Sequence, residues 1–242
     1  CKGKLHSADR PHYERKEMAI NLQSTSTVHT DGIKIVVYGA AGSGKTSLIP
    51  TLPNPVILSA EGGLLSISDK EIPFIEVKSM DAFKEAYTWL NESDEAKQFD
   101  SVALDSISEI GEVCLNHEKK VSKDGRAAYG EMASVMAEAI RSFRDLPGKN
   151  VYMTAKLDKS QDENGRVLYA PSMPGTKMGQ AIPYFFDVVA AMRVEKDAEG
   201  VTQRALMCES DGLWQAKDRS GKLESWEAPD LGDIIKKIGG KK

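Results

Sequence analysis

The sequence predicts an α/β fold in which helices flank a mostly parallel central sheet. From Ile33 onward, short apolar runs of strand length alternate with longer amphipathic stretches, which is the pattern of a parallel sheet with crossover helices. Apolar residues make up 40% of the 242 positions, enough to fill one large core. After residue 194, turns separate short segments, which predicts C-terminal β-hairpins.

Six short apolar runs are the expected strands, at residues 33–38, 55–59, 74–77, 101–105, 150–154 and 188–194. Helical patterns lie between them at 45–50, 79–91, 107–119 and 127–146. The turns of the expected hairpins are "DAEG", "ESDG" and "DRSG", and a short helix at 231–238 precedes the basic end of the chain. Alternation of this kind predicts one layered domain.

The first 30 residues are polar and show no periodicity. We therefore expect residues 1–30 to lie outside the folded part, as a disordered or expression-derived segment, and a single domain to span 31–242. Met18 opens a stretch that would make a sensible start of translation, so the seventeen residues before it are interpreted as upstream translation, an expression remnant or a flexible tail.

Charge, cysteine and histidine content exclude several classes of protein for this chain. A net charge of −4 argues against a surface that is positive throughout, so a polyanion would have to be held by local basic segments. Cys1, Cys114 and Cys208 form no CxxC pair, and the four histidines lack metal-ligand spacing. Because no apolar run approaches the roughly 20 residues of a membrane span, we expect a cytoplasmic protein without a membrane partner.

The first expected strand runs directly into "GAAGSGKTS", which matches G-x-x-x-x-G-K-[ST] between a strand and a helix. Glycines let the backbone turn tightly enough for successive N–H groups to point at one phosphate. Lys45 would supply charge to the β- and γ-phosphates, and Thr46 would offer its hydroxyl to Mg²⁺. The predicted nucleotide-binding residues are Gly39, Ala40, Ala41, Gly42, Ser43, Gly44, Lys45, Thr46 and Ser47.

Two carboxylates are candidates for metal binding and catalysis. Asp105 ends the apolar strand in "SVALDS", where its carboxylate could reach a magnesium ion beside Thr46; the alternative is an ordinary turn aspartate. Hydrolysis also needs a group that orients or deprotonates water. Many ATPases place a glutamate directly after the metal aspartate, but Ser106 stands there. Glu61, at the end of the strand in "PVILSAEGGL", is the predicted base, and Glu109 is its competitor.

The ordered set "GAAGSGKTS", "VILSAEGG" and "SVALDSIS" resembles the core ATPase of the RecA-like recombinases and hexameric helicases. The similarity covers about 33–222 and is greatest to the small phage RecA-like ATPases linked to single-strand annealing and recombination. It implies a RecA-like P-loop NTPase core that binds and hydrolyses ATP with Mg²⁺. It also implies a γ-phosphate sensor in "VYMTAK", where Thr154 and Lys156 stand in place of the asparagine–glutamine pair of the recombinases.

The resemblance extends to partners. "WQAKDRSGK" is similar to the hairpin by which one subunit reaches the ATP of its neighbour, which gives Lys217 and Arg219 a catalytic role and implies a head-to-tail homo-oligomer, a ring or a filament. Loops at 119–130 and 157–178 would face single-stranded DNA, although such charge runs are also typical of solvated surface. The expected DNA contacts are Lys119, Lys120, Lys123, Arg126, Lys159, Arg166 and Lys177.

The resulting expectation is a DNA-stimulated ATPase of phage-type recombination or annealing, in the bacterial host cytoplasm, with a single-strand binding protein as a further candidate partner. Two alternatives stay open. A P-loop kinase of a small molecule or nucleotide would need an acceptor pocket and an arginine-bearing lid. A nucleotide-gated structural or packaging subunit would bind nucleotide without binding DNA.

Overall fold

The computed structural model describes residues 24–25 and 32–239, apart from the side chains of Thr176 and Lys177. Most of the segment expected at 1–30 therefore lies outside the described residues. Within the described ranges, no helix combines the length and the apolar character needed to cross a bilayer.

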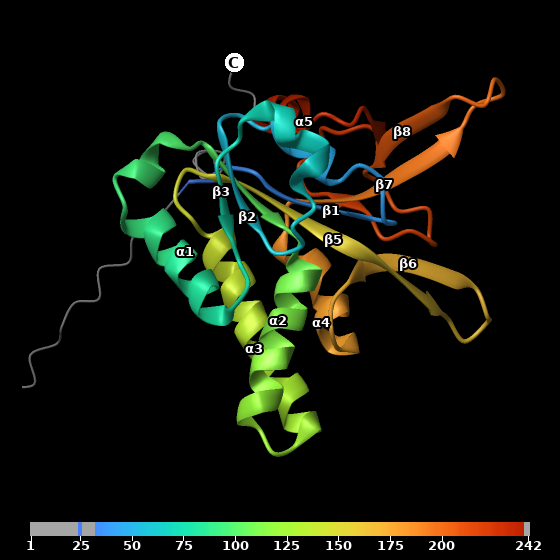
Figure 1. Cartoon of the computed structure of the whole chain (residues 1–242). Coiled ribbons are helices and arrows are strands. Elements are labelled where there is room, and N and C mark those ends of the chain that lie inside the picture. Colours follow the sequence, from blue (N-terminus) through green and yellow to red (C-terminus); the bar gives the residue numbers. More distant parts are fainter. Residues whose placement is uncertain (1–23, 26–31, 240–242) are drawn as a thin grey trace, which may run out of the picture.

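One mixed sheet of ten strands organises the described chain (Figure 1). Its central part is parallel, in the order β7-β1-β5-β4-β2-β3. These strands are β1 (Lys34–Gly39), β2 (Pro55–Ser59), β3 (Phe74–Glu76), β4 (Ser101–Asp105), β5 (Asn150–Gln161) and β7 (Val188–Lys196). Because all six run in the same direction, their carboxyl ends meet at one edge of the sheet.

Antiparallel strands extend this sheet beyond β7 and along the final residues of β5. β6 (Val167–Ser172) pairs with β5, and β8 (Thr202–Met207) and β9 (Lys217–Asp218) pair with β7. β10 (Trp226–Glu227) pairs with β8. The DAEG turn joins β7 to β8 as expected, whereas the other two turns connect strands that do not pair with each other.

Helices cover both faces of the sheet. On one face lie α1 (Met80–Glu92), α2 (Ile107–Val121) and α3 (Gly125–Arg144), with α4 (Thr176–Ala181) and η5 (Ile182–Phe185) beside them (Figure 1). On the other face lie α5 (Leu231–Gly239) and two 3₁₀ helices, η2 (Thr46–Thr51) and η3 (Leu64–Lys70). A further 3₁₀ turn, η4 (Glu95–Gln98), precedes β4.

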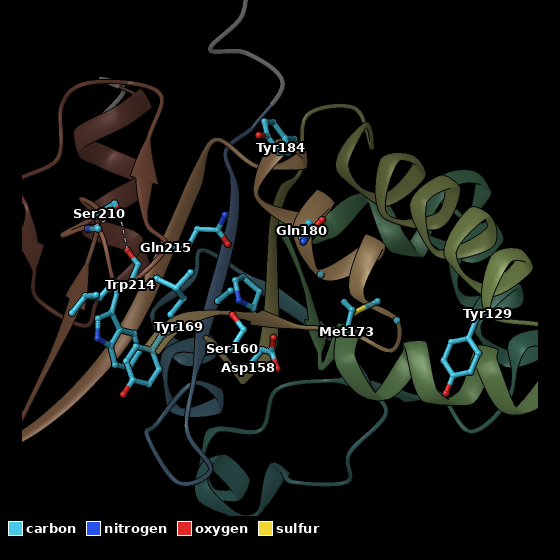
Figure 2. A pocket seen from close by; sticks show the side chains of 17 residues that line it. Tyr129, Asp158, Ser160, Tyr169, Met173, Gln180, Tyr184, Ser210, Trp214 and Gln215 are labelled. Atoms are coloured by element: carbon cyan, nitrogen blue, oxygen red, sulfur yellow. Dashed lines mark hydrogen bonds between the residues drawn. The ribbon is translucent and has the colours of Figure 1, made fainter. Parts of the chain in front are cut away.

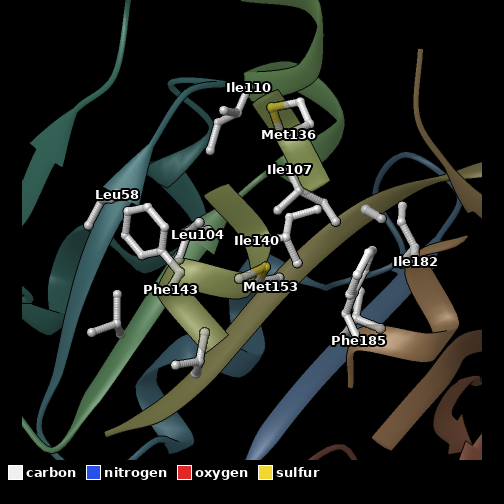
Figure 3. Packing of buried hydrophobic residues seen from close by; sticks show 14 of the residues in the cluster. Leu58, Leu104, Ile107, Ile110, Met136, Ile140, Phe143, Met153, Ile182 and Phe185 are labelled. Carbon is white, nitrogen blue, oxygen red and sulfur yellow. The ribbon is translucent and has the colours of Figure 1, made fainter. Parts of the chain in front are cut away.

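Strand periodicity divides the core between these faces. In β1, Val36 belongs to the apolar cluster under α1–α3, and the adjacent Val37 belongs to the cluster under α5. Figure 3 shows the first cluster, where Ile140 and Phe143 of α3 point toward Leu104 of the sheet. The apolar stripe predicted for residues 127–146 is therefore core packing, as expected.

The six predicted strands and the four longer helices are present, but the two loops expected at 119–130 and 157–178 are wrong. The fifth strand continues seven residues beyond 154 and pairs with β6, so 157–178 is mostly a hairpin and α4 rather than a loop. Residues 119–130 are mainly the ends of α2 and α3. Backbone pairing and helix capping need no apolar pattern, which is why these polar stretches gave no signal.

Candidate active site

The phosphate loop, residues 39–46, follows β1 at the carboxyl edge of the sheet. Gly42 and Gly44 have φ angles of 73° and 103°, a region that side chains with a Cβ rarely adopt. The predicted helix at 45–50 is instead a six-residue 3₁₀ helix that contains Pro50. Proline lacks an N–H and prevents a regular α-helix there, so phosphate binding depends on the amides of the loop itself.

Lys45 folds back over this loop. Its Nζ donates hydrogen bonds to the carbonyl oxygens of Gly39 and Ala40, over 2.9 and 3.0 Å. Burial lowers the pKa of this lysine, while the nearby carboxylates of Glu61 and Asp105 act in the opposite direction. The ammonium group therefore lies between the loop and both carboxylates that the sequence singled out.

The metal ligands proposed from the sequence lie next to each other. Thr46 Oγ1 donates to Asp105 Oδ2 over 2.8 Å, and the hydroxyl of buried Thr154 donates to Asp105 Oδ1. Nearby, the hydroxyls of Ser43 and Ser59 are buried and have no hydrogen-bond partner in the described structure. A hydroxyl, a carboxylate and further oxygen atoms are the donors that Mg²⁺ prefers, so the residues present fit this ion.

Residues at the end of the neighbouring strand β4 contact Glu61. Its backbone N–H donates to the carbonyl oxygen of Asp105 over 3.4 Å, and its Oε1 accepts a hydrogen bond from the hydroxyl of Ser106. The same hydroxyl caps α2 by accepting from the N–H of Glu109. Sequence analysis noted Ser106 only as the residue that stands where other ATPases have a glutamate, and the structure shows that its hydroxyl donates to the carboxylate of Glu61.

The two sensor candidates have different surroundings. Thr154 is fully buried behind Asp105, and its hydroxyl donates to the carboxylate of that residue. Lys156 pairs with Glu109 Oε2 over 2.6 Å, and this contact raises the pKa of the lysine. The competitor for the catalytic base, Glu109, is thus turned toward Lys156 on the first turn of α2.

Arg219 lies at the opposite edge of the sheet, and Lys217 lies nearer the middle, on β9. β9 pairs with the first residues of β7, and the N–H of Arg219 donates to the carbonyl of Asp187, which precedes β7. The guanidinium of Arg219 also contacts Asp187 Oδ1 at 3.5 Å and donates to the carbonyl of Tyr184 over 2.7 Å. Burial lowers the pKa of Lys217, as does, to a smaller extent, the cation of Arg219. Along the strand direction, Arg219 is level with Lys34 at the start of β1, about 17 Å from the phosphate loop at 3.3 Å per residue, whereas Lys217 is level with Val36, about 10 Å from the loop.

The candidate DNA contacts form two groups on separate projections (Figure 1). One group lies at the tip of the α2–α3 hairpin and consists of Lys119, Lys120, Lys123 and Arg126. The other lies on the β5–β6 hairpin, with Lys159 on β5 and Arg166 before β6. The side chain of Lys177 lies outside the described residues. Arg166 is already paired with Asp162 at 2.7 Å, which leaves it a weaker candidate than Lys159.

A groove of about 950 Å³ lies between these projections (Figure 2). Aromatic side chains from separate parts of the chain line it, namely Tyr129, Tyr169, Tyr184 and Trp214. Tyr169 and Trp214 stack with their ring centroids 4.1 Å apart, and Tyr184 is 75% exposed. Sequence analysis missed Tyr184, in the short η5, and Trp214, in an isolated bridge to Tyr169, because single aromatic residues in such short elements carry no periodic signal.

The fold and the site together define a P-loop ATPase domain with a RecA-like arrangement. A family described as an AAA domain matches residues 31–220, and the chain belongs to this family. A KaiC-like protein, PH0186 from the hyperthermophilic archaeon Pyrococcus horikoshii OT3, is similar at 12% identity and a TM-score of 0.39 over 73% of this chain and 78% of that one. No curated protein matches the chain.

Proposed function

We propose that the protein binds Mg²⁺-ATP between the subunits of a head-to-tail homo-oligomer and uses hydrolysis to change its grip on single-stranded DNA during recombination or annealing. The observation that carries the hydrolytic part is the convergence of Thr46, Asp105 and Glu61 at one edge of the sheet. These three residues come from different elements and match the roles of metal ligand, second metal ligand and base.

The residues of the chain divide the chemistry between them. The amides of residues 42–46 and the ammonium of Lys45 hold the phosphates, and Mg²⁺, when bound, neutralises charge on the β- and γ-phosphate oxygens. Glu61 accepts the proton of the attacking water as the water oxygen bonds to the γ-phosphorus and the bond to the β-phosphate oxygen breaks. Ser106 keeps the carboxylate aimed at that water.

The position of Lys217 and Arg219 favours an oligomeric enzyme. In one chain Arg219 lies at the edge of the sheet away from the phosphate loop, and Lys217 precedes it on the same short strand. A second copy in head-to-tail contact would bring this edge against the phosphate loop of its neighbour. Arg219 would then exchange its contact with Asp187 for the transferred phosphoryl group, where such cations contribute about 10³ to 10⁵ in rate.

The groove between the two basic projections is the proposed path of the DNA strand. It is bordered by Tyr129 of the α2–α3 hairpin and Tyr169 of the β5–β6 hairpin, and each aromatic ring has a lysine within 6 Å of its centroid. Aromatic faces beside cations suit single strands, because bases stack on the rings while phosphates meet the cations.

The test is the rate of phosphate release and the particle size, each measured with and without single-stranded DNA. The proposal requires phosphate release without an acceptor, stimulation by DNA and particles larger than one chain. Phosphate transfer only to an added acceptor would instead support a small-molecule or nucleotide kinase. ATPase activity that ignores DNA, with no DNA binding at low salt, would support a structural or packaging subunit.

A further inference from the structure

Arg204 of β8 reaches the phosphate loop from a distant part of the sequence. It stands opposite Val194 in the β7–β8 hairpin, and its Nε donates to the carbonyl oxygen of Ser43 over 3.2 Å. A Cβ added to Gly44 would come within 3.4 Å of the same Nε. In the described part of the chain, Arg204 makes no ion pair with a carboxylate. Its guanidinium is therefore directed to the backbone of the loop, through the hydrogen bond to Ser43.

We infer that Arg204 is a positioning residue that orients the peptide between Ser43 and Gly44 for phosphate binding. In a trans peptide the carbonyl and the N–H point in opposite directions. A donor that fixes the Ser43 carbonyl on one side of the loop therefore directs the Gly44 N–H to the other side. Within the described structure this N–H has no hydrogen-bond partner, so it is available to a ligand.

The peptide needs such a support because of its glycine. Gly44 has a φ of 103° and no Cβ, so its own side chain does nothing to prevent rotation of the preceding peptide plane. A guanidinium is a strong donor, since hydrogen bonds from charged groups are roughly twice as strong as neutral ones. It also polarises the amide, which strengthens the opposite N–H as a donor to an anion.

The inference rests on the proposed binding of a nucleotide at this loop, and it assigns Arg204 to the phosphates rather than to the base. The experiment compares the dissociation constants of ADP and of inorganic tripolyphosphate, both with Mg²⁺, for the wild type, Arg204→Ala and Arg204→Lys. We expect Arg204→Ala to bind both ligands about three- to tenfold more weakly, the equivalent of one hydrogen bond, and Arg204→Lys to recover part of the loss.

Lys196→Ala is the matched control, because it removes an exposed cation from the same hairpin away from the loop. It should bind both ligands like the wild type, and the thermal midpoints of the ligand-free variants should agree. Weaker binding of ADP with unchanged binding of tripolyphosphate would overturn the inference, since it would indicate a contact with the base. So would wild-type affinity in Arg204→Ala. A wild type that binds neither ligand would refute the proposed function itself.

Discussion

Thr46 donates a hydrogen bond from Oγ1 to Asp105 Oδ2 over 2.8 Å, although 59 positions separate the two residues in the chain. Asp105 ends β4, and Thr46 begins η2 after the loop that follows β1; β1 and β4 are not neighbours in the sheet, because β5 runs between them. Thr154 of β5 fills this gap and donates to the other carboxylate oxygen. The contact between Thr46 and Asp105 therefore depends on the order of β1, β5 and β4 in the sheet. Substitutions of the residues around this contact test their roles.

Replacing Thr154 with valine should lower the free energy of unfolding by about 1–3 kcal/mol. Valine keeps the shape but leaves the buried Oδ1 of Asp105 without its donor, and an unsatisfied buried acceptor costs about this much. Urea denaturation of the ligand-free protein measures the difference. Thr154→Ser retains the hydroxyl and should stay within about 1 kcal/mol of the wild type. Equal stability of all three proteins would contradict the role given to Thr154.

Glu61→Gln should bind ATP normally and hydrolyse it at least about 10²-fold more slowly, because glutamine cannot accept the proton of water. Ser106→Ala leaves Glu61 in place but removes the hydrogen bond that orients its carboxylate. We therefore expect a smaller fall in kcat than in Glu61→Gln, with little change in KM. Single-turnover phosphate release together with nucleotide binding separates the two effects. Normal turnover in Glu61→Gln would refute the assignment of the base.

Lys45→Ala should abolish nucleotide binding or turnover, since it removes the cation nearest the loop. In the wild type, burial lowers the pKa of Lys45, so this lysine loses its proton at a lower pH than an ordinary lysine would. Affinity for ADP should therefore decline as the pH rises toward about 10. Lys45→Arg, whose cation does not titrate in this range, should show a flatter profile. A pH-independent affinity in the wild type would contradict this assignment.

A mixing experiment tests whether Arg219 acts on the neighbouring subunit. Glu61→Gln and Arg219→Ala should each be nearly inactive alone. In a random equimolar mixture, roughly one interface in four joins an intact Glu61 to an intact Arg219, so about a quarter of the wild-type rate should return. Activity that stays at the level of the separate variants would exclude action between subunits.

The basic tip of the α2–α3 hairpin should contribute to the salt dependence of DNA binding. If Lys120 and Lys123 contact phosphates, replacing both with alanine should make the negative slope of log K against log salt shallower by about 1.4. This is about 0.7 for each lost contact with a single strand. Fluorescence anisotropy with an oligonucleotide measures this slope. Lys97→Ala, in η4 and already paired with Asp94, is the control and should leave it unchanged. An unaltered slope in the double variant would remove this tip from the DNA path.

Much of the sheet could be predicted because buried strands and amphipathic helices leave periodic signals in the chain. The strand ending at Asp105 and the apolar face of α3 are examples. The continuation of β5 to Gln161 could not be predicted in this way, since residues 158–161 are exposed and pair with β6 through their backbone. The helix expected at 45–50 is a 3₁₀ helix instead, because Pro50 lacks the N–H that a regular α-helix would use.

The local sequence predicts the residue types of the candidate site: a glycine-rich loop, a lysine, a hydroxyl and two carboxylates near the ends of strands. These signals are local, because the geometry of a phosphate loop depends on residues that follow one another. The distant groups that contact these residues are seen only in the folded chain. Ser106 orients Glu61 across 45 positions and Arg204 reaches Ser43 across 161. Contacts of that range depend on the order and register of the strands, which no short stretch of sequence encodes.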